Sequence, residues 1–136
     1  YVYYADENTG IRKYHADPRQ GSAELALFGT DGFAEDREGI AIYSLDDTRG
    51  YILVSDQQAN RFNIYPREGD AGRPHQHSLL KSVPAATNEC DGIEVVSTAL
   101  GSRFPHGLFV AMSDNRTFQF YRWEGLAKGK PPLSIR

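Results

Sequence analysis

Acidic residues stand directly in front of two predicted strands of this 136-residue chain. Asp36 and Glu38 precede the apolar alternation of Ile40 and Ile42, and Asp91 precedes the run Gly-Ile-Glu-Val-Val. Because residues two apart on an extended backbone point the same way, the first two acids share a face. Aligning the two Gly-Ile pairs, which lie 53 residues apart, superposes Glu38 on Asp91. The shared register predicts that these acids gather in one place.

Gathered carboxylates repel one another, so holding them ionised at neutral pH calls for a cation. Calcium takes about 6–8 oxygen ligands from carboxylates, amides and water. Glu7 and the amide of Gln57 each follow a predicted strand and could add oxygens to such a site. Zinc is disfavoured because the only cysteine is Cys90, which we expect to be buried and inert. On the residues alone, solvated acids at strand ends remain an alternative interpretation.

The elements that must position these acids are predicted to be strands. Aromatic residues make up 12% of the chain, and its 13 glycines supply turns, a composition that favours β structure. The aromatic residues of the last strand, including Phe118, Phe120 and Trp123, are expected to pack in the core or between sheets. His75 and His77 are expected in a surface loop. We expect strands over 2–6, 11–15, 24–28, 38–44, 51–55, 61–66, 78–83, 92–98, 107–112 and 117–123, followed by a tail over 127–136.

These strands repeat along the chain. An apolar strand, an Asp, an amide or acid, a turn and an aromatic strand recur, ending at Tyr14, Tyr65 and Tyr121, with periods of 51 and 56 residues. Such periods are typical of four-stranded propeller blades. The sequence therefore predicts an all-β fold, a β-propeller represented by its last two to three antiparallel blades, at about 1–30, 36–83 and 89–124. Because a ring needs roughly 4–8 blades, missing blades or another chain would have to close it. A β-sandwich of about ten strands is the alternative.

Charge and hydropathy exclude some classes of partner. A net charge of −3 argues against a nucleic-acid surface, which needs a basic stripe. No apolar run approaches the roughly 18 residues of a membrane helix. The chain begins inside a predicted strand, so we expect that an upstream segment precedes it.

Several motifs resemble the C-terminal half of the β-propeller phytases. They are DREGIAIY, GYILVSDQQANRFNIYPREG, CDGIEV, RFPHGLFVA and RWEGLA, which lie in matching order and spacing, and the resemblance as a whole covers residues 2–127. The resemblance implies a six-bladed ring and a calcium-dependent phosphomonoesterase. The implied reaction removes phosphate from myo-inositol hexakisphosphate (3-phytase type) with a metal-activated water. It also implies a small-molecule polyphosphorylated inositol as partner and a secreted or periplasmic location.

Carried over onto this sequence, the resemblance implies that calcium is bound by Glu7, Asp36, Glu38, Gln57 and Asp91. Three of these, Glu38, Asp36 and Asp91, are implied to be catalytic. The internal repeat independently equates Glu7 with Gln57 and Glu38 with Asp91.

Arg37, which lies between two of the acids, is expected to be their ion-pair partner, with a substrate phosphate contact as the alternative. The lysines and arginines with which the family holds phosphates have no counterpart in this chain. Two other functions therefore remain open: a non-catalytic calcium-binding propeller module that binds a ligand or protein, and a phosphodiesterase or lactonase on a calcium propeller.

Overall fold

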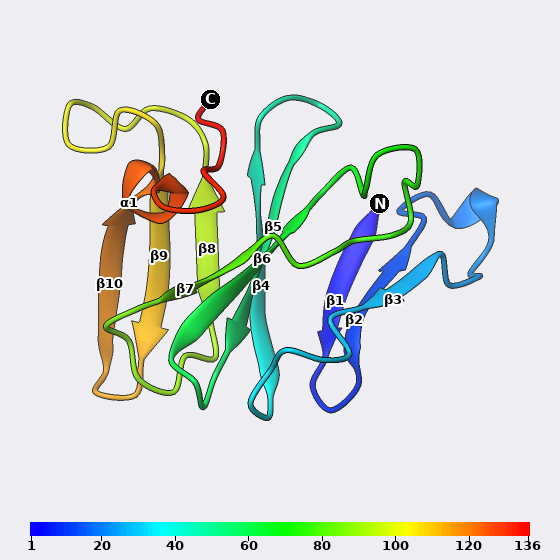
Figure 1. Ribbon diagram of the computed structural model, residues 1–136, viewed down its shortest axis with the longest axis horizontal. Coiled ribbons are helices and arrows are strands. Elements are labelled where there is room, and N and C mark those ends of the chain that lie inside the picture. The colour runs from blue at the N-terminus through cyan, green and yellow to red at the C-terminus, as the bar shows by residue number, and fades with distance from the viewer.

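Three antiparallel sheets lie side by side in the computed structural model, which covers residues 1–136 (Figure 1). The N-terminal sheet contains β1 (Val2–Asp6), β2 (Gly10–Tyr14) and β3 (Ala26–Phe28). The central sheet contains β4 (Arg37–Ser44), β5 (Gly50–Asp56), β6 (Arg61–Pro66) and β7 (Lys81–Pro84). The C-terminal sheet contains β8 (Ile93–Val96), β9 (Leu108–Ser113) and β10 (Thr117–Arg122).

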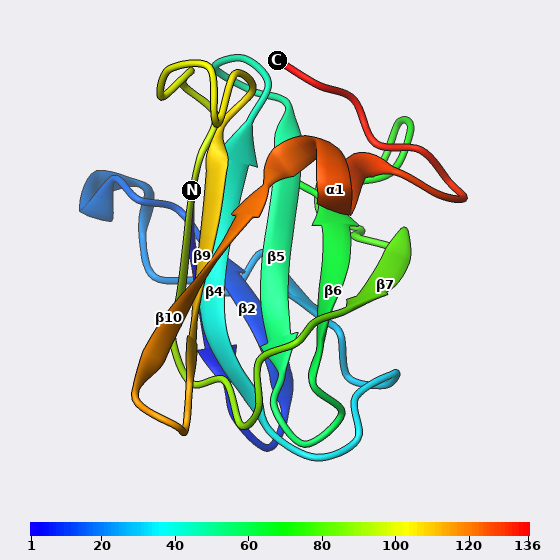
Figure 2. The same ribbon diagram turned by 90° about the vertical axis from the view of Figure 1, so that its left-hand side faces the viewer.

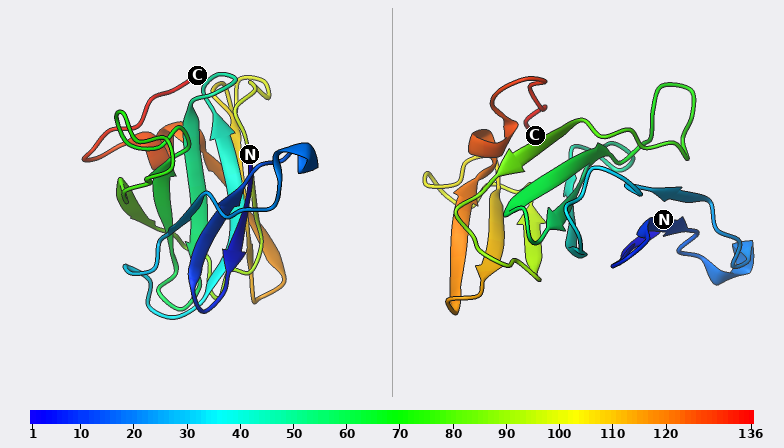
Figure 3. Two further views of the ribbon diagram at one scale, coloured as in Figure 1. Left: turned by 90° about the vertical axis from the view of Figure 1, so that its right-hand side faces the viewer. Right: turned by 60° about the horizontal axis from the view of Figure 1, so that its bottom comes forward.

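The predicted all-β fold made of propeller blades is confirmed by this arrangement. The three sheets fan out around their inner strands without closing a ring (Figure 3). The helical content is limited to η1 (Pro18–Gln20) and α1 (Trp123–Ala127). Neither is long and apolar enough to cross a membrane.

The central sheet is packed on both faces, because the side chains of β5 alternate between two cores. Ile52 and Val54 point into a cluster shared with the N-terminal sheet. Tyr51 and Leu53 point into a larger cluster shared with the C-terminal sheet. All seven residues of β5 are buried, which explains why its sequence is almost continuously apolar. Packing on both faces fixes the central sheet between its two neighbours.

The last residues, predicted as a tail, form no helix or strand after α1 but are held against the fold. Trp123 stacks on Tyr43, with ring centroids 3.6 Å apart, and its indole Nε1 donates a hydrogen bond of 3.0 Å to the carbonyl of Ser134. The backbone N–H of Ser134 donates to the hydroxyl of Tyr51 at 2.7 Å, and Leu133 is buried. The indole thus draws the chain end back over α1 and the central sheet (Figure 2).

Two aromatic side chains of β10 are also placed differently from the prediction. Phe118 and Phe120 are 71% and 62% exposed, because they lie on a face of the C-terminal sheet against which none of the other sheets packs. Tyr121 points to the opposite face and contacts Phe109, with ring centroids 5.8 Å apart. Only one face of this strand therefore contributes to the core.

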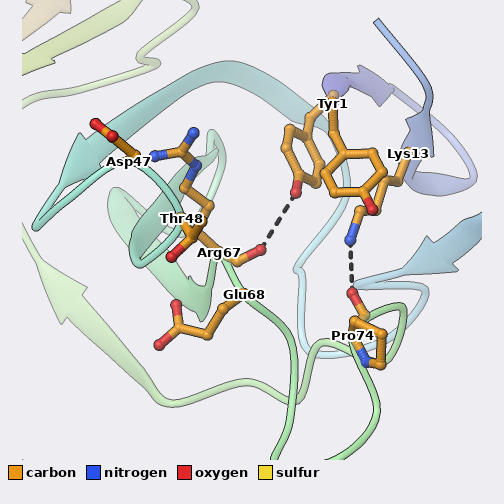
Figure 4. A pocket seen from close by; sticks show the side chains of 8 residues that line it. Tyr1, Lys13, Asp47, Thr48, Arg67, Glu68 and Pro74 are labelled. Carbon is orange, nitrogen blue, oxygen red and sulfur yellow. Dashed lines mark hydrogen bonds between the residues drawn. The ribbon is translucent and has the colours of Figure 1, made fainter.

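A buried polar joint connects the N-terminal and central sheets at the end opposite the β1–β2 turn. The Nζ of Lys13 donates to the carbonyl of Pro74 at 2.6 Å (Figure 4). The same Nζ lies 3.2 Å from Nε2 of His77. The Nδ1 of His77 lies 2.7 Å from the carbonyl of Pro66. Since a carbonyl can only accept, Nδ1 carries the proton and Nε2 accepts from Lys13. His77 is therefore buried in this joint, and its predicted placement in a surface loop is wrong.

Burial gives this joint a dependence on pH. Desolvation lowers the pKa of Lys13 to about 8. Burial also lowers the pKa of His77 below its ordinary value of 6.5, and the Lys13 charge adds to this effect, whereas the hydrogen bond to Pro66 opposes it. Asp70 and His75 contribute smaller, opposing charges. Below pH 6.5 the imidazole of His77 therefore binds a proton in the unfolded chain but not in the folded chain. The free energy of unfolding consequently falls with acidification.

We predict that His77→Gln makes thermal stability less sensitive to acid. Glutamine can still donate to Pro66 and accept from Lys13, but it does not titrate. Between pH 6.5 and the lower folded pKa of His77, the wild-type protein should lose up to about 1.4 kcal/mol per pH unit more than the variant. Thermal unfolding of the natural protein between pH 5 and 7.5 measures this difference.

The matched control for this experiment is His106→Gln. The ring of His106 makes one hydrogen bond, with the carbonyl of Arg136, and the residue is half-buried, away from the joint at Lys13. Parallel pH profiles for the wild type and His77→Gln would contradict the prediction.

Candidate metal centre

Each of the five residues predicted as metal ligands lies at one end of the three sheets, the lower end in Figure 1. Glu7 follows β1, and Gln57 follows β5. Glu38 is the second residue of β4, and Asp36 lies just before that strand. Asp91 lies just before β8. Since β4 lies between β1 and β8, the chain brings these side chains to one acidic rim.

Glu38 is the centre of this acidic rim. Its side chain is partly buried, and burial raises the pKa of its carboxyl group. The negative charges of Glu7, Asp91 and Asp36 raise that pKa further. Gln57 joins the same group because its Nε2 donates a hydrogen bond to Oδ1 of Asp91. The structure thus brings all five predicted residues together.

The carboxylates of the rim are near enough to repel one another but are not gathered as a ligand cluster. No group of three or more His, Cys, Asp or Glu side chains is arranged so that it could hold a metal ion. Mutual repulsion keeps like charges apart. Gln57 also turns its NH2 group, rather than its oxygen, toward Asp91. The donor set of four carboxylates and one amide fits the oxygen chemistry of calcium, and binding would require Gln57 to reverse its amide.

Arg37 fixes the loop that leads into this rim. Its side chain is 7% exposed, and its guanidinium donates to the carbonyls of Gly29 at 2.8 Å, Thr30 at 3.0 Å and Glu35 at 3.0 Å. A fourth hydrogen bond, of 3.4 Å, reaches the carbonyl of Glu7. The predicted ion pair between Arg37 and its acidic neighbours is wrong, because its donors are directed at backbone oxygens. This arrangement also gives no support to the predicted phosphate contact.

Asp56 anchors the same loop from the central sheet, and sequence reasoning missed its role. This fully buried carboxylate accepts a hydrogen bond of 2.9 Å from the backbone N–H of Ala34 and one of 2.6 Å from Nε of Arg61. Arg61 in turn donates to the carbonyl of Gly32 at 2.9 Å. The available signal in the sequence was an aspartate at the end of an apolar strand, immediately before Gln57. In the structure this strand is buried throughout. A charged residue is placed there only if it is paired.

Gly39 sets the distance between the two inner strands. A Cβ atom at this position would lie 2.8 Å from the backbone N of Ile93 and 3.0 Å from the carbonyl oxygen of Asp91. Only glycine therefore lets the backbone of residues 91–93, which leads into β8, lie against β4 beside Glu38. The hydroxyl of Ser55 holds the same segment in place by donating a hydrogen bond of 2.7 Å to the carbonyl of Cys90. As predicted, Cys90 is buried, and burial raises the pKa of its thiol.

The fold and the rim define a chain of propeller blades with acidic side chains at one end of its inner strands. A family model described as Phytase matches residues 1–122, so the chain belongs to the phytase family. It is 29% identical over 139 residues to the 3-phytase of Bacillus subtilis (strain 168). That alignment covers 93% of this chain and 36% of the relative, so the chain spans about a third of the relative's length.

We predict that Gly39→Ala weakens metal binding by displacing Asp91 from Glu38. The added methyl group has backbone atoms on its far side, so β8 must move away from β4. We expect a loss of about 1–3 kcal/mol of stability and a several-fold weaker calcium affinity. Thermal unfolding and isothermal titration of the natural protein measure the two effects.

Gly92→Ala is the control, because Gly92 holds the same place in the repeat. A Cβ at Gly92 would meet only the Cγ of Met112, at 3.5 Å, which is ordinary van der Waals contact. Equal stability and equal calcium affinity of the two variants would contradict the role assigned to the close contact between Gly39 and the backbone before β8.

Proposed function

We propose that this chain supplies the metal-binding part of the active site of a calcium-dependent phosphomonoesterase acting on myo-inositol hexakisphosphate. The proposed ligands are Glu7, Asp36, Glu38, Gln57 and Asp91. Of these, Glu38, Asp36 and Asp91 are proposed to be catalytic. One observation carries the proposal: acids from the N-terminal, central and C-terminal sheets meet around one partly buried carboxyl group, Glu38. Family membership and the name of the relative support it.

Bound calcium would reverse the sign of the local charge, polarise a phosphoryl oxygen and activate a water for in-line attack. The residues of the chain supply the fixed frame for this chemistry. Arg37 and Asp56 hold the loop before β4 in place, so the backbone of Asp36 and Glu38 is positioned by contacts that do not depend on a ligand. Such preorganisation reduces the rearrangement that binding requires.

The rim itself offers no free basic side chain for the substrate. Arg37 is buried, and its donors are directed at carbonyls. Holding a polyphosphate at four carboxylates would therefore depend on the cation and on basic groups outside the rim. The same observation favours the second candidate, a non-catalytic calcium-binding module that binds a ligand or protein. For the phosphatase we also propose a secreted or periplasmic location, on the strength of the family resemblance.

We predict that Glu38→Gln in the natural protein weakens calcium binding and slows phosphate release together. Glutamine keeps the shape of the side chain but removes one negative charge from the centre of the rim. We expect a loss of about tenfold or more in both quantities, since tenfold corresponds to about 1.4 kcal/mol. The measurements are isothermal calcium titration and the release of inorganic phosphate from inositol hexakisphosphate.

Glu94→Gln is the matched control, because Glu94 is an exposed acid further along β8. It should leave both quantities close to wild type. Identical behaviour of Glu38→Gln and Glu94→Gln would count against the metal-site assignment. A wild-type protein that binds calcium but releases no phosphate, together with weaker calcium binding in Glu38→Gln, would instead favour the non-catalytic module.

A further inference from the structure

Gln58 lies beside the acidic rim and bridges two of its members. Its Oε1 accepts a hydrogen bond of 2.9 Å from the backbone N–H of Asp36. Its Nε2 donates to Oδ2 of Asp36 at 2.7 Å and to Oε1 of Gln57 at 2.9 Å. The orientation of this amide is fixed by its partners, because a backbone N–H must face an oxygen and a carboxylate must face an NH2 group.

This one amide group holds Asp36 at two points. Asp36 is held through both its backbone and its side chain, and the carboxylate is left with Oδ1 free. The same NH2 group also donates to the amide oxygen of Gln57, a bond that Gln57 would give up on turning this oxygen toward a cation. These bonds tie the end of the loop before β4 to the turn after β5, two segments that are distant in sequence. Gln58 is half-buried, so solvent competes with these hydrogen bonds less than at an exposed site.

We propose that Gln58 is a positioning residue of the metal centre, which aligns Asp36 as a calcium ligand. This inference rests on the proposed function, because it concerns the same cation. Residues that hydrogen-bond to metal ligands orient them, and their loss commonly weakens metal affinity by about 10–100-fold. The position requires an amide of this length. A glutamate would place a further negative charge against Asp36, and an asparagine would be shorter by one carbon–carbon bond, roughly 1.5 Å.

The test is Gln58→Met in the natural protein, because methionine has a similar length but cannot make the three hydrogen bonds. We expect the calcium affinity, measured by isothermal titration, to fall about tenfold. The calcium concentration for half-maximal phosphate release should rise by the same factor. The maximal rate at saturating calcium should stay close to wild type, since every proposed ligand remains. Gln58→Asn should give a similar loss and carries the test if Gln58→Met does not fold.

Gln119→Met is the control, because the half-buried Gln119 makes its hydrogen bonds to Ala86 and Tyr121, away from the acids. It should bind calcium like the wild type. Normal calcium affinity in Gln58→Met, with or without a lower calcium-free unfolding temperature, would overturn the positioning role and leave the proposed function intact. A wild-type protein that binds no calcium would overturn both. A fall in affinity for Gln58→Met but not for Gln119→Met supports the inference.

Discussion

Repulsion among the four carboxylates of the rim, with Glu38 at their centre, is the constraint on which the rest of this structure depends. The buried charges nearby do not relieve it. Arg37 directs its guanidinium to backbone carbonyls, and Asp56 is paired with Arg61. These groups stabilise the backbone of the loop but leave the negative charge of the rim uncompensated. A rigid scaffold that presents unneutralised oxygens is suited to a hard cation, and this is the physical basis of the proposed function.

Packing on both faces of the central sheet supplies the rigidity. The alternation along β5 fills two cores, one with each neighbouring sheet. At the far end from the rim, Trp123 stacks on Tyr43 and binds the last residues of the chain. Near the rim, the close approach at Gly39 brings the backbone of Asp91 against β4. The acids are therefore positioned by backbone contacts between sheets, and these contacts cannot relax far to relieve the repulsion.

The sequence allowed prediction of the parts of this structure that depend on local pattern. Alternating apolar residues located the strands, and the Gly-Ile register led to Glu38 at the start of β4 and Asp91 just before the neighbouring strand β8. The sequence did not reveal hydrogen-bond partners that follow no sequence pattern. The acceptors of Arg37 are loop carbonyls, which any residue could supply. The burial of His77 depends on how a loop packs against Lys13, far away in the chain. Two consecutive glutamines gave no sign that the second would hold the carboxylate of Asp36.

The most direct measurement is an anomalous-scattering map from crystals of the natural protein grown with calcium. The account predicts a cation at the rim, with a carboxylate oxygen of Glu38 about 2.3–2.6 Å from it and oxygens of Asp36 and Asp91 in the same coordination shell. Gln57 should then present its amide oxygen to the ion. A map with no ion at the rim, with these carboxylates still apart and the Gln57 NH2 group still on Asp91, would contradict the account.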